Sequence, residues 1–147
     1  MPNLQLRILT SESVKFDEPV DMVVMRCVYD DTGKRSSVGE LGILPGHAPL
    51  SGVLGISPFR ILQDGVERVL AVYGGVVNVQ NNAVTVITER ARWPEDIDRA
   101  NAESEHERLE RERETLSDDQ DIRSNQIALR RALVEIEVSS YPLVGRK

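Results

Sequence analysis

The chain contains 147 residues, carries a formal net charge of -6 at pH 7, and has 4% aromatic residues. An acidic chain with few aromatic rings offers neither a basic face for phosphates nor a stacking surface for bases, which excludes nucleic acid as a partner. The single cysteine, Cys27, excludes an internal disulfide, and no cluster of Cys and His has metal-ligand spacing. We therefore expect a protein of a reducing compartment, with Cys27 as a small buried strand residue.

The first residues lack the basic and apolar stretches of a signal peptide, and no apolar run approaches the roughly 18 residues of a membrane helix.

Residues 1–90 have the sequence pattern of an antiparallel β-domain. From Leu4 to about Thr88, short alternating apolar runs are separated by turn residues, and the segments 63–65 and 80–82 have hairpin-turn composition. This spacing favours an antiparallel β-sandwich or flattened barrel over a parallel sheet.

The segment 39–50, Gly-Glu-Leu-Gly-Ile-Leu-Pro-Gly-His-Ala-Pro-Leu, predicts a loop of defined shape. Its glycines and prolines restrict the backbone path, which leaves Glu40 and His47 as the polar side chains expected to point outward. A small hydrolase using His47 and Glu40 is one interpretation, but acid-base catalysis needs an orienting partner and a pocket, and neither is evident nearby. The pattern favours a turn that packs on the core and contacts another protein.

Two adjacent glycines occur in the segment 73–76, Tyr-Gly-Gly-Val. A phosphate-binding loop would continue with Lys and Ser or Thr and open a helix, whereas this segment is followed by a strand pattern. We therefore expect a β-bulge or a close approach between strands here.

Residues 91–147 predict a two-helix hairpin, so the fold class is α+β. After Trp93 the sequence has only one Pro before position 142 and is rich in Glu, Arg, Ala and Gln. Pro94 suits the first turn of a helix ending near Leu116, and the segment 117–119 supplies a turn and an N-cap for a second helix ending near Val138.

The hairpin has a thin apolar surface. The first helix has a seam of Ala102, Leu109 and Leu116, and the second has a wider stripe of Ile122, Leu129, Leu133 and Ile136, with Ile127 and Val134 beside it. A few buried aliphatic side chains at about 1.5 to 3 kcal/mol each must offset an ordering cost of roughly 1 to 2 kcal/mol per residue. We expect docking of the hairpin on the sandwich to be only marginally favourable, so that a partner can overturn it.

Four landmarks occur in family order along nearly the whole chain: the loop 39–50, the segments 73–79 and 82–86, and a polar helical tail beginning near Glu95. Together they resemble the epsilon subunit of bacterial F-type ATP synthase. The resemblance implies a non-catalytic central-stalk subunit, peripheral on the cytoplasmic side of the membrane, that couples ion-driven rotation to ATP synthesis. It also implies contacts with the gamma subunit, the c-ring and the beta and alpha subunits, with the C-terminal helices restraining ATP hydrolysis. A generic sandwich adaptor and an ATP-sensing module remain alternatives.

The resemblance also assigns contact residues. It implies that Glu40 and His47 face the polar loops of the c-ring, so that the membrane is reached only through the complex. It implies that basic residues of the second helix meet an acidic loop of the beta subunit, and Arg123, Arg130 and Arg131 are the candidates, with simple solubility as the alternative. The polar segment 29–38 is longer than the family's usual connection, and we interpret it as an extended hairpin tip of unknown function.

Some bacterial members of this family bind ATP on the hairpin. The matching positions here are Ile97, Asp98, Asn101, Ala102, Arg131 and Glu135. Asn101 and Glu135 stand where the motif has arginines, which removes two cations from a polyphosphate site and adds an anion. We expect weak or absent ATP binding and no cofactor. The pair Arg99-Ala100 would serve instead only if the helix start were shortened.

Overall fold

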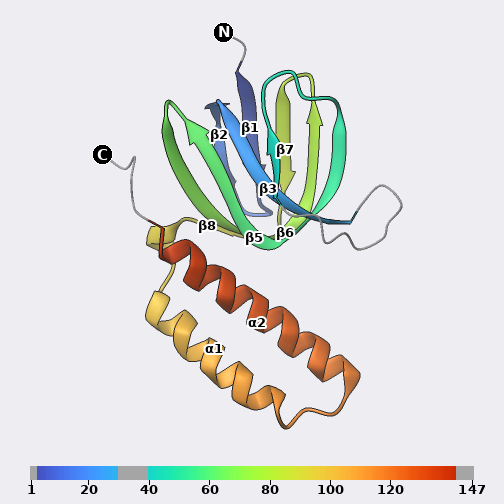
Figure 1. Ribbon diagram of the computed structural model, residues 1–147, viewed down its shortest axis with the longest axis vertical. Coiled ribbons are helices and arrows are strands. Elements are labelled where there is room, and N and C mark those ends of the chain that lie inside the picture. The colour runs from blue at the N-terminus through green and yellow to red at the C-terminus, as the bar shows by residue number, and fades with distance from the viewer. Residues whose placement is uncertain (1–2, 30–39, 142–147) are drawn as a thin grey trace.

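A computed structural model describes residues 3–29 and 40–141, which form a β-sandwich above a two-helix hairpin (Figure 1). The strands are β1 (Leu4–Leu9), β2 (Val14–Val20), β3 (Met22–Tyr29), β4 (Glu40–Ile43), β5 (Leu50–Gln63), β6 (Val66–Gln80), β7 (Ala83–Ile87) and β8 (Ala91–Arg92). A 3₁₀ turn η1 (Pro94–Asp96) leads to α1 (Arg99–Arg113) and α2 (Asp119–Ser139). The expected sandwich followed by a helical hairpin is confirmed. Of the segment interpreted as a hairpin tip, positions 30–38 lie outside the described residues.

One sheet with the strand order β2-β1-β7-β6-β5-β3-β4 builds the sandwich, and β8 pairs with β6. The pairs are antiparallel except β1 with β7, which are parallel. A parallel pair needs a long connection between its strands, and the segment from β2 to β6 provides it. The long strands β5 and β6 bend so that the sheet closes over its apolar face (Figure 1). Inward side chains such as Leu6, Ile8, Phe59 and Val84 are fully buried there, and this burial is the main driving force of the fold.

The predicted turns are confirmed by their backbone angles. Asp64 and Gly65 between β5 and β6 have φ of 52° and 77°, and Asn81 and Asn82 between β6 and β7 have φ of 52° and 60°. Positive φ at both central residues is what a two-residue hairpin requires, and Gly, Asn and Asp adopt it at the lowest cost.

The two adjacent glycines mark a close strand approach, as expected. Gly75 has φ of 130°, and a Cβ at this position would overlap the carbonyl oxygen of Ile87. At this point β6 changes partner: Ala71 and Val72 pair with β8, whereas Val76 onward pairs with β7. Glycine thus lets β6 pass close to the end of β7.

The prediction of one helix starting at Pro94 is wrong. Residues 94–96 form only a 3₁₀ turn, Ile97 and Asp98 are extended with φ of -101° and -86°, and α1 begins at Arg99. The physical reason is that the Asp98 side chain accepts a hydrogen bond from the Asn101 backbone N–H at 3.0 Å. An N-cap of this kind requires extended backbone at Asp98 and sets the helix start there. The second helix begins after its cap Asp118, as expected.

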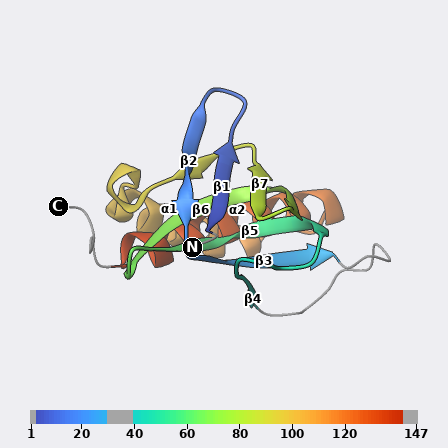
Figure 2. The same ribbon diagram turned by 90° about the horizontal axis from the view of Figure 1, so that it is seen from above.

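The second helix lies between the first helix and the sandwich, and Figure 2 shows both helices beneath the sheet when viewed from above. The predicted apolar stripe of α2 is partly wrong, because Ile127 and Leu133 are each 45% exposed. Two opposite faces of α2 are buried instead of one broad face. Asn125 faces α1 and donates from Nδ2 to the Leu109 carbonyl at 2.9 Å, while Val134 faces the sandwich.

Cys27 lies in β3, as expected, but it is only half-buried. The register between β3 and β5 shifts on both sides of Cys27, which turns this part of the strand partly out of the core. Burial still raises the pKa of the Cys27 thiol above its ordinary value.

Candidate functional site

The hairpin is joined to the sandwich by a second apolar cluster, which we call the docking cluster. It comprises Val69, Ala71 and Tyr73 of β6 with Val134 and Val138 of α2, each at most 6% exposed. Half-buried Ile56, Ile97 and Tyr141 surround it. Because Ala71 and Tyr73 have no place in the main core, their burial depends on α2.

Beside the docking cluster, one carboxylate joins α2 to the sandwich. The Tyr73 hydroxyl donates a hydrogen bond to Glu135 Oε2 at 2.7 Å, and the same oxygen lies 3.7 Å from Arg92 Nη1. Burial, followed by the hydrogen bond to Glu135, raises the pKa of the Tyr73 hydroxyl far above its ordinary value. Tyr73 therefore remains a proton donor to Glu135 at neutral pH.

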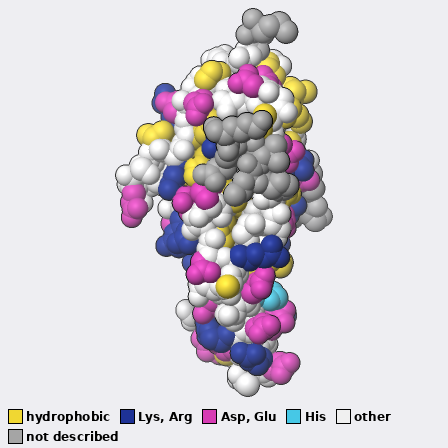
Figure 3. Space-filling view, turned by 90° about the vertical axis from the view of Figure 1, so that its left-hand side faces the viewer, with side chains coloured by type: hydrophobic (Ala, Val, Ile, Leu, Met, Phe, Trp, Pro, Cys, Tyr) yellow, Lys and Arg dark blue, Asp and Glu magenta, His cyan; other side chains and the backbone are white. Residues whose placement is uncertain are grey.

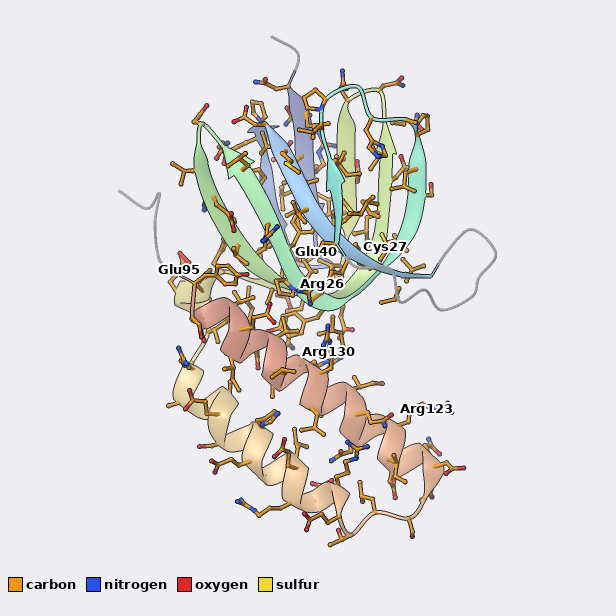
Figure 4. All side chains as sticks on the ribbon, in the orientation of Figure 1. Arg26, Cys27, Glu40, Glu95, Arg123 and Arg130 are labelled. Atoms are coloured by element: carbon orange, nitrogen blue, oxygen red, sulfur yellow. The ribbon has the colours of Figure 1, made fainter. Side chains whose placement is uncertain are left out.

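The predicted basic contact residues of α2 separate into two groups. Arg130 Nε donates to the Ile56 carbonyl at 3.0 Å, and Arg131 lies 3.9 Å from Glu89. Both therefore lie against the sandwich, whereas Arg123 lies at the far end of α2 (Figure 4).

The six positions of the degraded ATP motif have structural roles in the docked hairpin. The main residues are Ile97, packed on the docking cluster, Asp98, which caps α1, and Ala102, which is buried at 3% exposure. Asn101 contributes its backbone N–H to the cap, and Arg131 and Glu135 form ion pairs with the sandwich. The two second-helix positions of the motif, Arg131 and Glu135, are thus already paired with Glu89 and Arg92 of the sandwich. Weak or absent ATP binding stays a prediction.

Glu40 and His47 are not brought together. Glu40 begins β4, pairs with Arg26 of β3 and lies 3.5 Å from Arg60 Nε, on the side of the sandwich near α2 (Figure 4). His47 lies in the loop between β4 and β5, whose Gly46 N–H donates to the side chain of Asn82 in the β6–β7 turn at 2.6 Å. That turn is at the end of the sheet away from the hairpin (Figure 1). The two side chains therefore do not share a site, which a general acid and base acting on one substrate would require.

An exposed apolar row crosses the outside of the sheet, and sequence analysis missed it. Leu9 pairs with Val14 on one side and Ile87 on the other, Ile87 pairs with Val76, and Val76 pairs with Val53. Cross-strand pairs point to the same face, so these residues of β2, β1, β7, β6 and β5 form one strip, which we call the outer row. Val14 is 59% exposed and Ile87 is 53% exposed. A contiguous exposed apolar surface of this kind marks an interaction site.

The hairpin surface is different in character. Figure 3 shows acidic and basic side chains interspersed over it. On α1, Arg108 contacts Glu105 at 2.8 Å and Glu112 at 2.9 Å, and the Arg108 hydrogen bond lowers the pKa of Glu105. Pairs at this spacing stabilise an exposed helix slightly.

Other features of the described residues bear on chemistry. A polar hollow of about 600 Å³ is lined by both basic and acidic side chains, among them Lys15, Glu89, Arg90 and Asp96. Over 3–29 and 40–141, no three His, Cys, Asp or Glu side chains are grouped to hold a metal ion. No helix in the same ranges has the length and apolar character to cross a membrane.

The sandwich with its outer row and the separately attached hairpin define a protein of the binding-subunit class, whose prominent features are surfaces suited to contact with other chains. Residues 3–94 match the family model for the β-sandwich domain of the ATP synthase delta/epsilon chain. The chain therefore belongs to the ATP synthase epsilon chain family, as the resemblance implied.

The relatives extend this match over the helices. The ATP synthase epsilon chain of Caldicellulosiruptor bescii is 33% identical over 95% of each chain. That of Pediococcus pentosaceus is 36% identical over 94% of this chain and 96% of its own, and that of Bacillus subtilis is 34% identical over 84% and 86%.

Solved structures share the fold at low sequence identity. A chain in the Euglena gracilis mitochondrial ATP synthase structure containing OSCP, F1 and the c-ring matches with a TM-score of 0.77 at 20% identity, covering 96% of this chain and 83% of that one. A chain of the Tetrahymena thermophila central stalk and c-ring matches with a TM-score of 0.59 at 10% identity, covering 94% and 97%.

Proposed function

We propose that this chain is the epsilon subunit of a bacterial F-type ATP synthase. It is a non-catalytic part of the central stalk, peripheral on the cytoplasmic side of the membrane, and it couples ion-driven rotation to ATP synthesis. The observation that carries the proposal is the match to bacterial epsilon chains along both the sandwich and the hairpin. A hairpin attached through a separate small cluster supports a second, regulatory role.

The outer row is the proposed contact with the gamma subunit. It is continuous over five strands, and Val14, Ile87 and Val76 are each about half exposed or more. The docked hairpin uses other residues of β6, so the row stays free while the hairpin is docked. An apolar strip suits a permanent partner in a stalk that transmits torque, because burial of such a strip is strong and non-directional.

The opposite end of the sandwich is the proposed contact with the c-ring. His47 and the exposed Leu44 lie on the loop anchored to Asn82, away from the hairpin. Glu40 lies beside α2 and already contacts Arg60, so we assign the ring contact to the His47 loop rather than to both residues. These polar contacts position the complex and contribute modest energy each.

The hairpin is proposed to restrain ATP hydrolysis by leaving the sandwich and entering the catalytic head. Release frees Arg130 and Arg131 from their contacts with the sandwich, and they then join Arg123 as cations available to the acidic loop of the beta subunit. The docked and released states then compete for the same arginines.

The gamma contact can be tested by binding. Val76→Ser with Ile87→Ser, two substitutions at outward positions, should weaken the complex with purified gamma subunit by at least tenfold because both side chains leave an apolar interface. Leu133→Ser, also an exposed aliphatic position but on α2, is the matched control and should leave the affinity unchanged. Equal affinity for the paired variant and the unchanged chain would refute the assignment of the outer row.

A further inference from the structure

The hairpin is attached to the sandwich through α2, and the polar contacts across this boundary differ in burial. Glu135 is 20% exposed and its partner Tyr73 only 6%. By contrast, Glu137 and Arg26 are 40% and 36% exposed at a distance of 3.9 Å. Exposed ion pairs contribute little, whereas a hydrogen bond to a charged group is shorter and stronger. Arg130 and Arg131 also contact the sandwich but are exposed, so Glu135 is the most buried of these charged α2 side chains and the one expected to influence docking most.

The position of Glu135 along the chain increases this influence. Arg92 lies in β8, immediately before the linker, and Glu135 lies in the last third of α2. Between them the backbone is extended at Ile97 and Asp98, where no regular element constrains it. Movement of the hairpin about these residues must separate Glu135 from both Tyr73 and Arg92.

The sandwich side of this contact is anchored by packing next to Arg92. Trp93, next to Arg92, packs against the main core, and the Arg68 guanidinium lies 4.1 Å from the centre of its ring. Phe16 lies 6.2 Å from the same ring. The cation-π and aromatic contacts hold the chain up to Trp93 against the sandwich, so the neighbouring Arg92 stays with the sandwich when the hairpin moves.

We propose that Glu135 is a built-in latch, whose carboxylate binds the Tyr73 hydroxyl and Arg92 and selects the docked hairpin without any bound nucleotide. The latch sets the fraction of chains whose hairpin is released. The docking claim concerns this chain alone, and only its consequence for hydrolysis rests on the proposed function.

Hydrogen exchange of the full chain, followed by mass spectrometry, tests the latch. Glu135→Gln keeps the size and helix propensity of the side chain but removes its charge, and Tyr73→Phe removes only the hydroxyl. Each should raise exchange of the α2 amides by roughly tenfold. The double variant should accelerate exchange by less than the product of the two single effects, because both changes weaken the same hydrogen bond.

The matched control is Glu137→Gln, the same chemical change two positions along α2, which should alter exchange by less than about twofold. Amides of β1 and β7 should not respond in any variant. Equal effects of Glu135→Gln and Glu137→Gln, additive effects of Glu135→Gln and Tyr73→Phe, or equal acceleration in β1 would each overturn the latch.

The same variants in an assembled synthase separate the latch from the proposed function. A released hairpin should restrain hydrolysis more, so Glu135→Gln should lower ATP hydrolysis while Glu137→Gln leaves it unchanged. If exchange in α2 rises as expected but hydrolysis does not change, the latch is supported and the regulatory part of the proposed function fails.

Discussion

Weakening the docking cluster should release the hairpin while leaving the sandwich folded. Val134 and Val138 are 1% and 0% exposed, and both contact residues of β6 that lie outside the main core. Replacing each with Ala removes two methyl groups, at about 0.8 kcal/mol per group, and leaves a small cavity. The pair of substitutions should therefore cost about 4 kcal/mol, which shifts the docking equilibrium on the order of a thousandfold.

Hydrogen exchange resolved by segment measures this release. In the Val134→Ala and Val138→Ala double variant, amides of α2 should exchange much faster, and those of β1 and β7 should keep their protection. Leu133→Ala, on the same helix but 45% exposed in the unchanged chain, should cost less than about 1 kcal/mol and serves as the control. Loss of protection across the sandwich as well would refute the reasoning, because the hairpin and sandwich would then form one cooperative unit.

Three further predictions address the strand crossing, the buried hydroxyl and the ATP site. Gly75→Ala should lower the free energy of unfolding by about 3 kcal/mol or more in thermal denaturation, because of the overlap with Ile87, whereas Gly65→Ala, at a turn with open space, should cost about 1 kcal/mol; similar costs would contradict this. The raised pKa of Tyr73 contributes stability that is present below about pH 10 and is lost as pH rises through the folded-state value, so Tyr73→Phe should flatten the stability profile above that pH. If Tyr73→Phe and the unchanged chain lost stability equally above that pH, this prediction would be wrong. Calorimetry with ATP should detect no binding in the low-micromolar range, because Glu135 stands where the family's ATP motif has an arginine. A dissociation constant in that range would contradict the prediction.

The local parts of the fold could be predicted from the sequence because local chemistry determines them. Asp64 and Gly65, like Asn81 and Asn82, are residues that tolerate positive φ, and the hairpins form at these positions. The start of the first helix was predicted wrongly because two sequence signals competed. Pro94 suits a first helical turn, but the Asp98 cap supplies a hydrogen bond that a helix running through it would lose.

The candidate sites were less predictable because they depend on contacts between distant residues. Tyr73 and Glu135 are 62 positions apart, and nothing near Tyr73 in the sequence indicates a carboxylate partner. The outer row likewise depends on register, since Val14, Leu9 and Ile87 become neighbours only when β1 pairs with β2 and β7. Apolar residues at outward positions of all five strands were the signal that could have revealed it.

The central claim is that the hairpin regulates a rotor subunit whose sandwich does the coupling, and ATP hydrolysis tests it most directly. A chain ending at Pro94 keeps β8, Trp93 and the whole main core, while it lacks both helices. Assembled into the synthase in place of the full chain, it should bind gamma normally and give faster ATP hydrolysis. Equal hydrolysis with the full and shortened chains, at equal incorporation, would contradict the account.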